Sequence, residues 1–384
     1  MRITQIFLLT VLILGLSLSF TNRITDTVTI TFSSTNPPTS RSGHILAFDV
    51  ESQKIFLFGG YDGENFLDDT WFYDFKNKIW TQVSLELKPS ARWTHAMVYD
   101  SSNEKMILFG GYNESGCLND TWVFDLTDNS WKEMKPENTP SPRHTHTMVY
   151  DPDNQKVILF GGNSWGAQQR DMWTYDYQSN QWDQIIPDLS PPSKSIHAMS
   201  LDSDNRKIIL FGGYGAYDSI TDDTWVYDIS NNTWEEMSSI SKPNARFGHT
   251  MAYDAHIKKT ILFGGSSNDG SMEDTWVYDL SSDNWVKVDP LNRPDPRYLH
   301  SMVYHPNNQF LILFGGMKSE DIFLNDLWVY NSSASTNTWI EIGNNKVHST
   351  SGVDWIPTLL AGTVILLKKK KTGIYSSNKR KKVL

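Results

Sequence analysis

The chain has 384 residues, of which 39% are hydrophobic and 13% aromatic, including 15 Trp, 16 Tyr and 18 Phe. This apolar content excludes a disordered chain, and the single cysteine, Cys117, excludes a disulfide framework and a cysteine-based zinc site. The net charge of −10 is unevenly placed, because residues 20–355 hold 25 basic against 44 acidic residues, so no nucleic-acid partner is expected.

The N-terminal segment 1–19 is typical of a secretory signal peptide. Arg2 precedes an apolar run that begins at Ile6 and ends in the small residues Ser17 and Ser19, and cleavage after Ser19 fits this spacing. A buried N-terminal helix or strand is the structural alternative. In the following segment, 20–37, residues 28–32 (VTITF) indicate a strand that either helps to close a ring of repeats or lies outside it.

Residues 38–345 hold six copies of a four-part pattern that recurs every 51 or 52 residues. Each copy has a basic-x-x-His element, a Phe-Gly-Gly triplet, a Trp on an Asp-Thr-Trp-like stem, and a second Trp further on. The triplets begin at Phe58, Phe109, Phe160, Phe211, Phe263 and Phe314. Self-similarity at a fixed period indicates a repeat architecture.

Each copy predicts four short strands, for which the second copy serves as the example. The ranges are 95–100, which alternates in polarity, 106–109, which is continuously apolar, and then 121–124 and 131–134. Gly110 and Gly111 are expected to end the second strand, where the backbone takes unusual dihedral angles or lies against a neighbour. Four antiparallel strands repeated radially make a β-propeller, whose core lies between the apolar faces of adjacent units.

These repeats resemble the kelch-repeat family, which is marked by the Phe-Gly-Gly triplet, the Trp-Val-Tyr-Asp strand at 225–228 and 276–279, and the Trp that follows. The resemblance covers residues 38–345. It implies an all-β fold, a six-bladed kelch β-propeller with four antiparallel strands per blade. The sixth copy departs from the pattern, because Asn331 replaces the Asp and extra residues precede Trp339.

Residues present in all six copies are predicted to serve the scaffold, because a catalytic constellation is local and asymmetric. We expect the six His to be buried hydrogen-bonding groups, the Gly pairs to serve backbone geometry, and both sets of Trp to be packing residues. The basic position has two interpretations. It pairs with the Asp of the Asp-Thr-Trp-like stem, or it forms a positive rim at one channel mouth that binds a carboxylate or an acidic peptide. Some kelch proteins use Arg at such strand starts for acidic partners, so the resemblance favours considering the rim. The six residues are Arg41, Arg92, Arg143, Lys194, Arg246 and Arg297.

The copies differ most in the loop after Phe-Gly-Gly and in the connection to the next copy. Because strand direction alternates, both sets of loops should emerge on one face. Aromatic residues with scattered polar groups suit contact with a protein or a carbohydrate. The candidate binding residues on this face are Tyr61, Trp93, Tyr112, Trp165, Tyr214, Tyr217, Phe247 and Tyr298.

Three function classes remain open. The first is a non-enzymatic binding module for a protein or a glycan, and the second is a surface structural spacer. The third is a carbohydrate-active enzyme. Copper radical oxidases resembling galactose oxidase need a Cys cross-linked to Tyr, but Cys117 lies in a variable loop without such a motif. Sugar mutarotases resembling this fold need only a few polar residues at the channel mouth. His144 and His146 lack a third ligand, so we predict no metal site, no cofactor and no catalytic residue. An enzyme should show a polar pocket with perturbed ionisable groups, whereas a binding module should show a broad aromatic face.

The C-terminal region begins with a linker, 346–355, and continues with an uncharged run, 356–367 (IPTLLAGTVILL). As a helix these residues would rise about 18 Å against roughly 30 Å of hydrocarbon, so a short membrane anchor would need snorkelling lysines and a thin membrane. The basic tail 368–384 suits a stop-transfer orientation with the tail in the cytoplasm. The alternative is a tail that lies on an anionic membrane surface. Both ends of the chain predict an extracellular or cell-surface protein.

Overall fold

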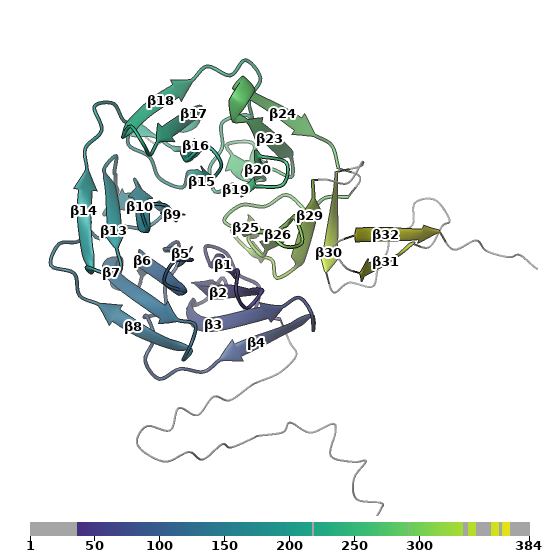
Figure 1. Cartoon of the computed structure of the whole chain (residues 1–384), viewed down its shortest axis with the longest axis horizontal. Helices are drawn as coiled ribbons and strands as arrows, with labels where there is room; N and C mark the ends of the chain where they lie inside the picture. The colour runs from purple at the N-terminus through teal and green to yellow at the C-terminus, as the bar shows by residue number, and fades with distance from the viewer. Residues whose placement is uncertain are drawn as a thin grey trace, which may run out of the picture.

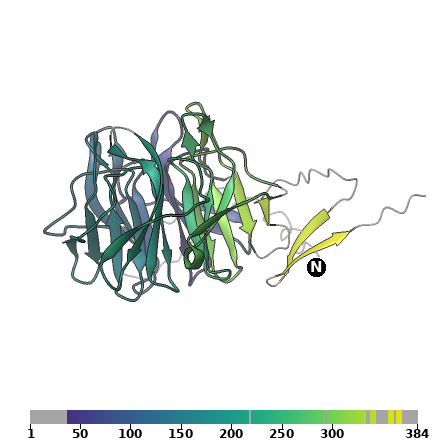
Figure 2. The ribbon, with the colours of Figure 1, turned by 90° about the horizontal axis from the view of Figure 1, so that it is seen from above.

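The structure is a computed structural model that describes residues 37–216, 219–290, 292–332, 337–342, 355–360 and 363–368. Six four-stranded antiparallel sheets stand around a central axis, with the first strand of each innermost and the fourth outermost (Figure 1). Figure 2 shows the ring from its edge, with the strands running through its thickness. The predicted six-bladed all-β propeller is therefore confirmed.

The strands of each blade follow one another in chain order. Blade 1 comprises β1 (Ile45–Asp49), β2 (Lys54–Tyr61), β3 (Phe66–Asp74) and β4 (Ile79–Val83). Blade 2 comprises β5 (Ala96–Asp100), β6 (Lys105–Asn113), β7 (Gly116–Asp125) and β8 (Ser130–Met134). Blade 3 comprises β9 (Thr147–Asp151), β10 (Lys156–Phe160), β13 (Met172–Asp176) and β14 (Gln181–Ile185), with the short hairpin β11 (Asn163–Ser164) and β12 (Ala167–Gln168).

The second half of the ring repeats this order. Blade 4 comprises β15 (Ala198–Asp202), β16 (Lys207–Tyr214), β17 (Ile220–Asp228) and β18 (Thr233–Met237). Blade 5 comprises β19 (Thr250–Asp254), β20 (Lys259–Phe263), β23 (Thr275–Asp279) and β24 (Asn284–Val288), with hairpin β21 (Ser266–Ser267) and β22 (Gly270–Ser271) and a 3-10 turn, η2 (Leu280–Ser282). Blade 6 comprises β25 (Ser301–His305), β26 (Phe310–Phe314), β29 (Leu327–Asn331) and β30 (Thr338–Ile342), with hairpin β27 (Met317–Ser319) and β28 (Ile322–Phe323).

The Phe-Gly-Gly triplet does not end the second strand in every blade. In blades 1, 2 and 4 the pairing with the third strand resumes beyond the triplet after a register shift, which lies between Phe109 and Gly111 in blade 2. The prediction that the glycines end the strand was wrong for these three blades. Gly110 and Gly111 have φ angles of +62° and +107°, so they accommodate a β-bulge that bends the ladder without stopping it. In blades 3, 5 and 6 the ladder between the second and third strands stops at the Phe, as predicted.

The hydrophobic core lies between blades, as predicted. Each of six clusters of buried side chains draws on two adjacent blades. Between blades 1 and 2, for example, the rings of Phe58 and Trp131 lie with their centroids 5.1 Å apart. The second Trp of four blades also reaches across this boundary, as when Trp182 Nε1 donates to Thr121 Oγ1 at 3.0 Å. The two sets of Trp are therefore packing residues.

Blades 6 and 1 close the ring through side-chain packing and backbone hydrogen bonds. Each of these two blades is complete, with four strands of its own. Trp80 of blade 1 packs on Phe314 of blade 6 with centroids 5.1 Å apart. The backbone of Arg41 donates to Leu324 O at 2.9 Å and accepts from Gly316 N at 2.8 Å. The strand predicted at 28–32 lies outside the described residues, so its part in closure stays a prediction.

The apolar run 356–367 falls mostly within an antiparallel pair of strands, β31 (Trp355–Leu360) and β32 (Thr363–Lys368). Across the part of the chain that the structure describes, no helix is both long and apolar enough to cross a membrane. The signal peptide at 1–19 lies outside the described residues, as does the tail beyond residue 368. Both remain predictions.

Candidate functional site

Two sets of loops share one face of the ring, as predicted. The loops after the second strand of each blade (61–68, 112–119, 163–170, 214–216, 219–222, 266–273 and 317–325) meet the connections between blades (84–91, 135–142, 186–193, 238–245, 289–290 and 292–296). We call this surface the loop face. The opposite surface, which carries the tight turns such as 50–53 and 75–78, is called the turn face. The residues that lie between the connections from blade to blade and the first strands also belong to the loop face, because six isolated backbone bridges pair them with the loop after the second strand of the same blade: Ser42–Tyr61, Trp93–Tyr112, His144–Asn163, Ser195–Tyr214, Phe247–Ser266 and Tyr298–Met317.

The six basic residues form internal ion pairs rather than a rim. In blade 1, Arg41 donates from Nη1 to Asp69 Oδ1 at 2.6 Å and from Nη2 to Asp69 Oδ2 at 2.7 Å, while Trp71 Nε1 donates to the same Asp69 Oδ2 at 2.6 Å. The other blades repeat the pair, with Lys in place of Arg in blade 4. The basic side chains Arg41, Arg92, Arg143, Lys194, Arg246 and Arg297 are at most 1% exposed.

The carboxylates of these pairs are stabilised in their charged form. Burial by itself would raise the pKa of Asp69, but the hydrogen bonds and charge of Arg41, together with the Trp71 indole, hold that pKa below its usual value. The basic residue of each repeat therefore pairs with the Asp of the Asp-Thr-Trp-like stem and does not form a positive rim at a channel mouth. A ligand at the loop face does not meet these cations, because each is buried against its own blade.

Most of the predicted aromatic residues gather in two groups on the loop face. In the first, the Tyr61 ring lies 6.2 Å from Trp93 and 5.8 Å from Phe323, between centroids. Tyr112 lies 5.3 Å from His144 in the neighbouring position.

The second group stands across the axis. Phe247 lies 4.6 Å from Tyr214 and 5.8 Å from Tyr298. Tyr217 falls outside the described residues. These rings are half-buried, apart from the more exposed Tyr112, so they offer ring faces to a partner while packing on one another.

Trp165 is the most exposed of these aromatic residues, with 66% of its surface accessible. It occupies the two-residue turn between β11 and β12 with φ of +51°, an unusual conformation for a bulky side chain. The indole lies over Gly116 of blade 2, where an added Cβ would come within 2.4 Å of the ring. The backbone N–H of Trp165 also points to Cys117 Sγ at 3.5 Å. The exposed indole therefore rests on the start of β7 in blade 2, where the neighbouring Cys117 also holds the Trp165 backbone.

Exposed large hydrophobic side chains concentrate on the same face. Among the described residues, ten large hydrophobic side chains are exposed, and seven of them belong to the loop face, although its loops are a minority of the chain. Ile186 and Ile240, in the connections on either side of blade 4, are among the most exposed. Large exposed apolar residues gathered on one face mark an interaction surface. The full loop-face set is Leu87, Tyr112, Trp165, Ile186, Leu189, Ile240 and Ile322.

A belt of backbone hydrogen bonds surrounds the axis just beneath the aromatic residues. Each residue of the belt donates its N–H to the carbonyl of the equivalent residue in the preceding blade, at 2.7 to 3.0 Å, and Gly43 N closes the circle on Leu299 O at 2.8 Å. All six have positive φ angles, including Thr and Ile residues that rarely adopt them. The six are Gly43, Thr94, Thr145, Ile196, Gly248 and Leu299.

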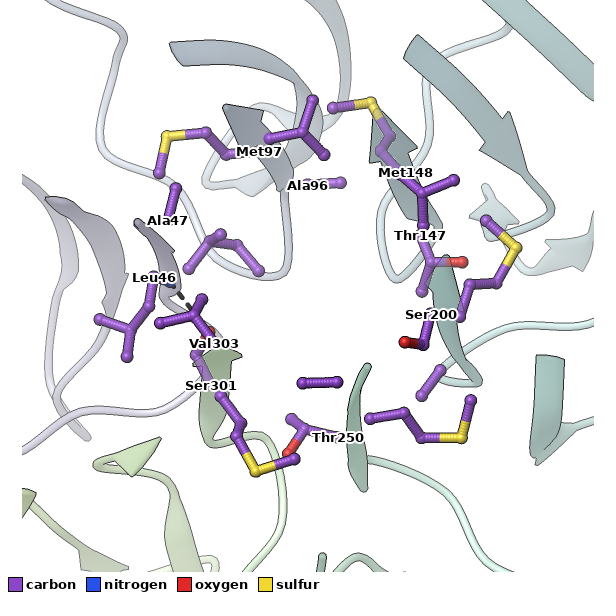
Figure 3. Close-up of a pocket in the computed structure, with 18 of the residues that line it drawn as sticks. Leu46, Ala47, Ala96, Met97, Thr147, Met148, Ser200, Thr250, Ser301 and Val303 are labelled. Atoms are coloured by element: carbon purple, nitrogen blue, oxygen red, sulfur yellow. Dashed lines mark hydrogen bonds between the residues drawn. The ribbon is translucent and has the colours of Figure 1, made fainter. Parts of the chain in front are cut away.

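The central channel is an apolar cavity of about 610 Å³ lined by the first strand of every blade (Figure 3). Its labelled wall residues are small or apolar, such as Ala96 and Val303, with the hydroxyls of Thr147, Ser200 and Thr250. No Asp, Glu, Lys or Arg is among the lining residues. The titratable side chains among the lining residues are six His and four Tyr.

The six repeated His residues reach the channel wall as buried, neutral groups. Each imidazole packs edge-to-face on the Phe of the preceding blade's triplet, as His95 does on Phe58 with centroids 5.5 Å apart. Burial, reinforced by the nearby basic residue, lowers the pKa of all six, to about 3 for His44 and His197. His197 Nε2 also lies 2.8 Å from Thr147 Oγ1. The predicted burial of these residues is confirmed. Hydrogen bonding of the ring is found for His197 and His300, whereas both ring nitrogens of His44, His95, His146 and His249 lack a partner among the described residues, so that part of the prediction was wrong for these four.

The candidate metal ligands considered from the sequence, His144, His146 and Cys117, do not form a common site. His144 packs on Tyr112, whereas His146 packs on Phe109 inside the boundary between blades 2 and 3. Cys117 is buried beneath the Trp165 loop. Within the described ranges, no cluster of three or more His, Cys, Asp or Glu side chains could hold a metal ion.

Sequence reasoning missed two parts of this site. Phe323 and the isolated apolar residues Leu87, Ile186 and Ile240 were not found, because each stands at a different position within its loop and no repeat signal marks it. The belt could have been suspected only from alignment of the copies, because Gly43 and Gly248 share one position with Thr, Ile and Leu residues.

Comparison with known proteins bears on this architecture. The family model described as "KLHDC2/KLHL20/DRC7 Kelch-repeats domain" matches residues 17–195 and 154–355. The chain is similar to an F-box/kelch-repeat protein of Arabidopsis thaliana, with 28% identity over 326 residues that cover 73% of this chain and 66% of the relative. It is similar to Mei4-dependent protein 6 of Schizosaccharomyces pombe, with 24% identity over 334 residues that cover 75% and 47%.

Human Kelch domain-containing protein 10 is a further relative, 25% identical over 297 residues that cover 70% of this chain and 65% of that protein. The chain thus spans between about half and two thirds of the length of these three relatives.

Proposed function

The chain belongs to the kelch-repeat family, and on that premise we propose that it is a non-enzymatic protein-interaction module whose partner binds the loop face. The propeller supplies a rigid platform, because its core runs between blades all the way round the ring. Loops on such a scaffold vary freely without loss of the fold. The relatives named for their kelch repeats carry this platform within longer chains.

The observation that carries the proposal is the concentration of exposed apolar side chains on the loop face. Trp165, Ile186 and Ile240 are exposed there, beside rings that are only half-buried. Interface centres are enriched in Trp and Tyr, which bury a large area at a small entropic cost. The turn face, by contrast, shows Val50 and Ile79 as its exposed large apolar residues among those that the structure describes.

We also propose that the module is displayed outside the cell. The signal-peptide pattern of residues 1–19 and the basic tail after the apolar run 356–367 support this location. A glycan is the second candidate ligand, favoured by the exposed indole of Trp165, which could stack on a sugar ring. Surface biotinylation of cells expressing the full chain should label the protein, and carbonate extraction should leave an anchored form in the membrane pellet. Absence from the labelled fraction would contradict the proposed location.

The binding proposal is tested with three forms of the full chain immobilised for capture of partners. The loop-face variant carries Trp165→Ala and Ile186→Ser, and the matched control carries Val50→Ser and Ile79→Ser on the turn face. We expect a protein that is retained by the wild type and by the control and lost by the loop-face variant. Equal retention by all three forms, or loss only in the turn-face control, would overturn the proposal.

A further inference from the structure

We propose that the loop face selects a basic partner: a protein segment rich in Lys and Arg, docked on the acidic and aromatic residues around the axis. This inference rests on the proposed function and adds the chemistry of the partner to it. An exposed ring of basic residues would have favoured an acidic ligand. Because that ring is buried in internal ion pairs, the charge of the expected partner is the opposite one.

The first step is the net charge of the loop face without the six buried ion pairs. The six basic residues of the ring are neutralised by their own Asp partners and are at most 1% exposed. The rest of the described loop face carries fourteen acidic residues and six basic ones. The surface available to a partner is therefore strongly negative.

The second step is that the protein itself already engages most of these few cations. Lys88, Lys242, Arg293, Lys318 and Lys135 each lie within 3.6 Å of a carboxylate of the chain. Among the described residues the salt bridges leave several exposed acids without a cation: Glu64, Glu114, Asp269, Glu320 and Asp321. Such acids gain from a cation that a partner brings.

The third step is the position of these acids beside aromatic rings. Asp62 and Glu64 lie one and three residues after Tyr61, and Glu114 lies two residues after Tyr112. The charge of Glu320 acts on Tyr298 closely enough to add to the effect of burial in raising the pKa of that phenol.

A cation over an aromatic face is attracted by the ring as well as by a nearby carboxylate. The indole of Trp165, 66% exposed and fixed over Gly116, is the best-presented ring for this purpose. Arg and Lys satisfy both kinds of group at once. An acidic segment would meet like charge, and a neutral apolar segment would leave the acids unused.

The test uses the full chain and a defined probe. The probe is a fluorescein-labelled 12-residue peptide with four Arg and one Tyr among Gly and Ser, and its counterpart has Glu in place of every Arg. Fluorescence anisotropy gives the dissociation constant at 50 mM and 300 mM NaCl. The loop-face variants are Trp165→Ala and the triple variant Asp62→Asn, Glu64→Gln, Glu320→Gln. The matched control, Glu51→Gln with Glu104→Gln, removes exposed acids of the turn face.

We expect the Arg peptide to bind the wild type and the control equally, and more weakly at high salt. Trp165→Ala should weaken binding about threefold, as for one exposed cation–π contact, and the triple variant about tenfold, as for three exposed ion pairs. The Glu peptide should bind at least about tenfold more weakly than the Arg peptide. Equal binding of both peptides, unchanged affinity in the loop-face variants, or equal loss in the turn-face control would overturn the inference.

These outcomes are distinct from failure of the proposed function. A partner whose capture depends on Trp165 but resists both 300 mM NaCl and the triple variant would keep the loop face as the interface and refute a basic partner. A partner whose capture ignores all loop-face variants would refute the proposed function itself.

Discussion

The six buried imidazoles make the stability of the propeller depend on pH in the range just below neutrality. Burial lowers the pKa of each, to about 3 for His44 and His197, whereas in the unfolded chain each returns to about 6.5. Below pH 6.5 the unfolded chain therefore takes up six protons that the folded chain does not. The stability that these groups contribute is fully present above pH 6.5 and is lost as the pH falls toward the folded pKa.

The size of the effect follows from linkage. Well below pH 6.5 one such His costs about 1.4 kcal/mol of unfolding free energy per pH unit. Between pH 7 and 5.5 the loss is about 1.3 kcal/mol for one His and about 8 kcal/mol for six, which is comparable with the whole stability of many domains, about 5–15 kcal/mol. We expect the propeller to approach acid unfolding near pH 5.5.

Urea unfolding of the full chain, followed by Trp fluorescence at pH 7.5, 6.5 and 5.5, measures this dependence. The variant His95→Gln should reduce the difference in unfolding free energy between pH 7.5 and 5.5 by about 1.4 kcal/mol, whatever its absolute stability, since one titrating group is gone. His256→Gln, at an exposed position, is the matched control and should behave as the wild type. A free energy that stays constant to about 1 kcal/mol over this range, or the same slope in both variants, would refute the reasoning.

Three further substitutions test the scaffold at neutral pH, each by urea unfolding. Asp120→Asn should cost about 3 kcal/mol, because it leaves the fully buried Arg92 without its carboxylate. Thr121→Val should cost about 1–3 kcal/mol, because it leaves the buried Trp182 Nε1 without an acceptor. Gly43→Ala should cost about 2–4 kcal/mol, because φ is +60° and the new Cβ would lie 2.0 Å from an indole nitrogen of the neighbouring blade.

The matching controls use positions that lack the feature concerned. Glu51→Gln removes an exposed acid, and Gly270→Ala adds a Cβ at a φ of +111° with no atom within 4 Å. Glu51→Gln should change the unfolding free energy by less than about 0.5 kcal/mol. Equal effects of Asp120→Asn and Glu51→Gln would show that the ion pair does not support the blade. A Gly43→Ala variant no less stable than Gly270→Ala would show that the indole moves aside without cost, and an unaffected Thr121→Val would show that water satisfies the Trp182 nitrogen.

The sequence by itself determined the number of blades, the four strands in each and the burial of the repeated His and Trp side chains. A period of 51 or 52 residues in six copies allows few other folds, and the polarity of each strand follows from local patterning. The gathering of variable loops on one face also followed, because strand direction alternates within every blade. These features depend on neighbours in sequence or on the repeat itself.

Only the tertiary structure decided what the charged residues and glycines that recur in every copy of the repeat do. Arg41 could pair or bind a ligand on sequence grounds, and the choice was made by Asp69, 28 residues away, which reaches it in a buried site. Burying an Arg without a carboxylate is costly, so the buried position of Arg41 requires the ion pair, and the sequence pattern alone did not show that burial.

The triplet and the belt were decided in the same way. Whether Gly110 and Gly111 stop a strand or bulge it does not follow from the length of the next loop. Blades 2 and 3 have the same number of residues between the triplet and the following Trp, yet only in blade 2 does the third strand resume pairing beyond the triplet. In the belt, Ile196 adopts the same left-handed backbone as Gly43, although its own preference is against it. Hydrogen bonds to the two adjacent blades impose that conformation, and a contact between blades leaves no local signal in the sequence of either one.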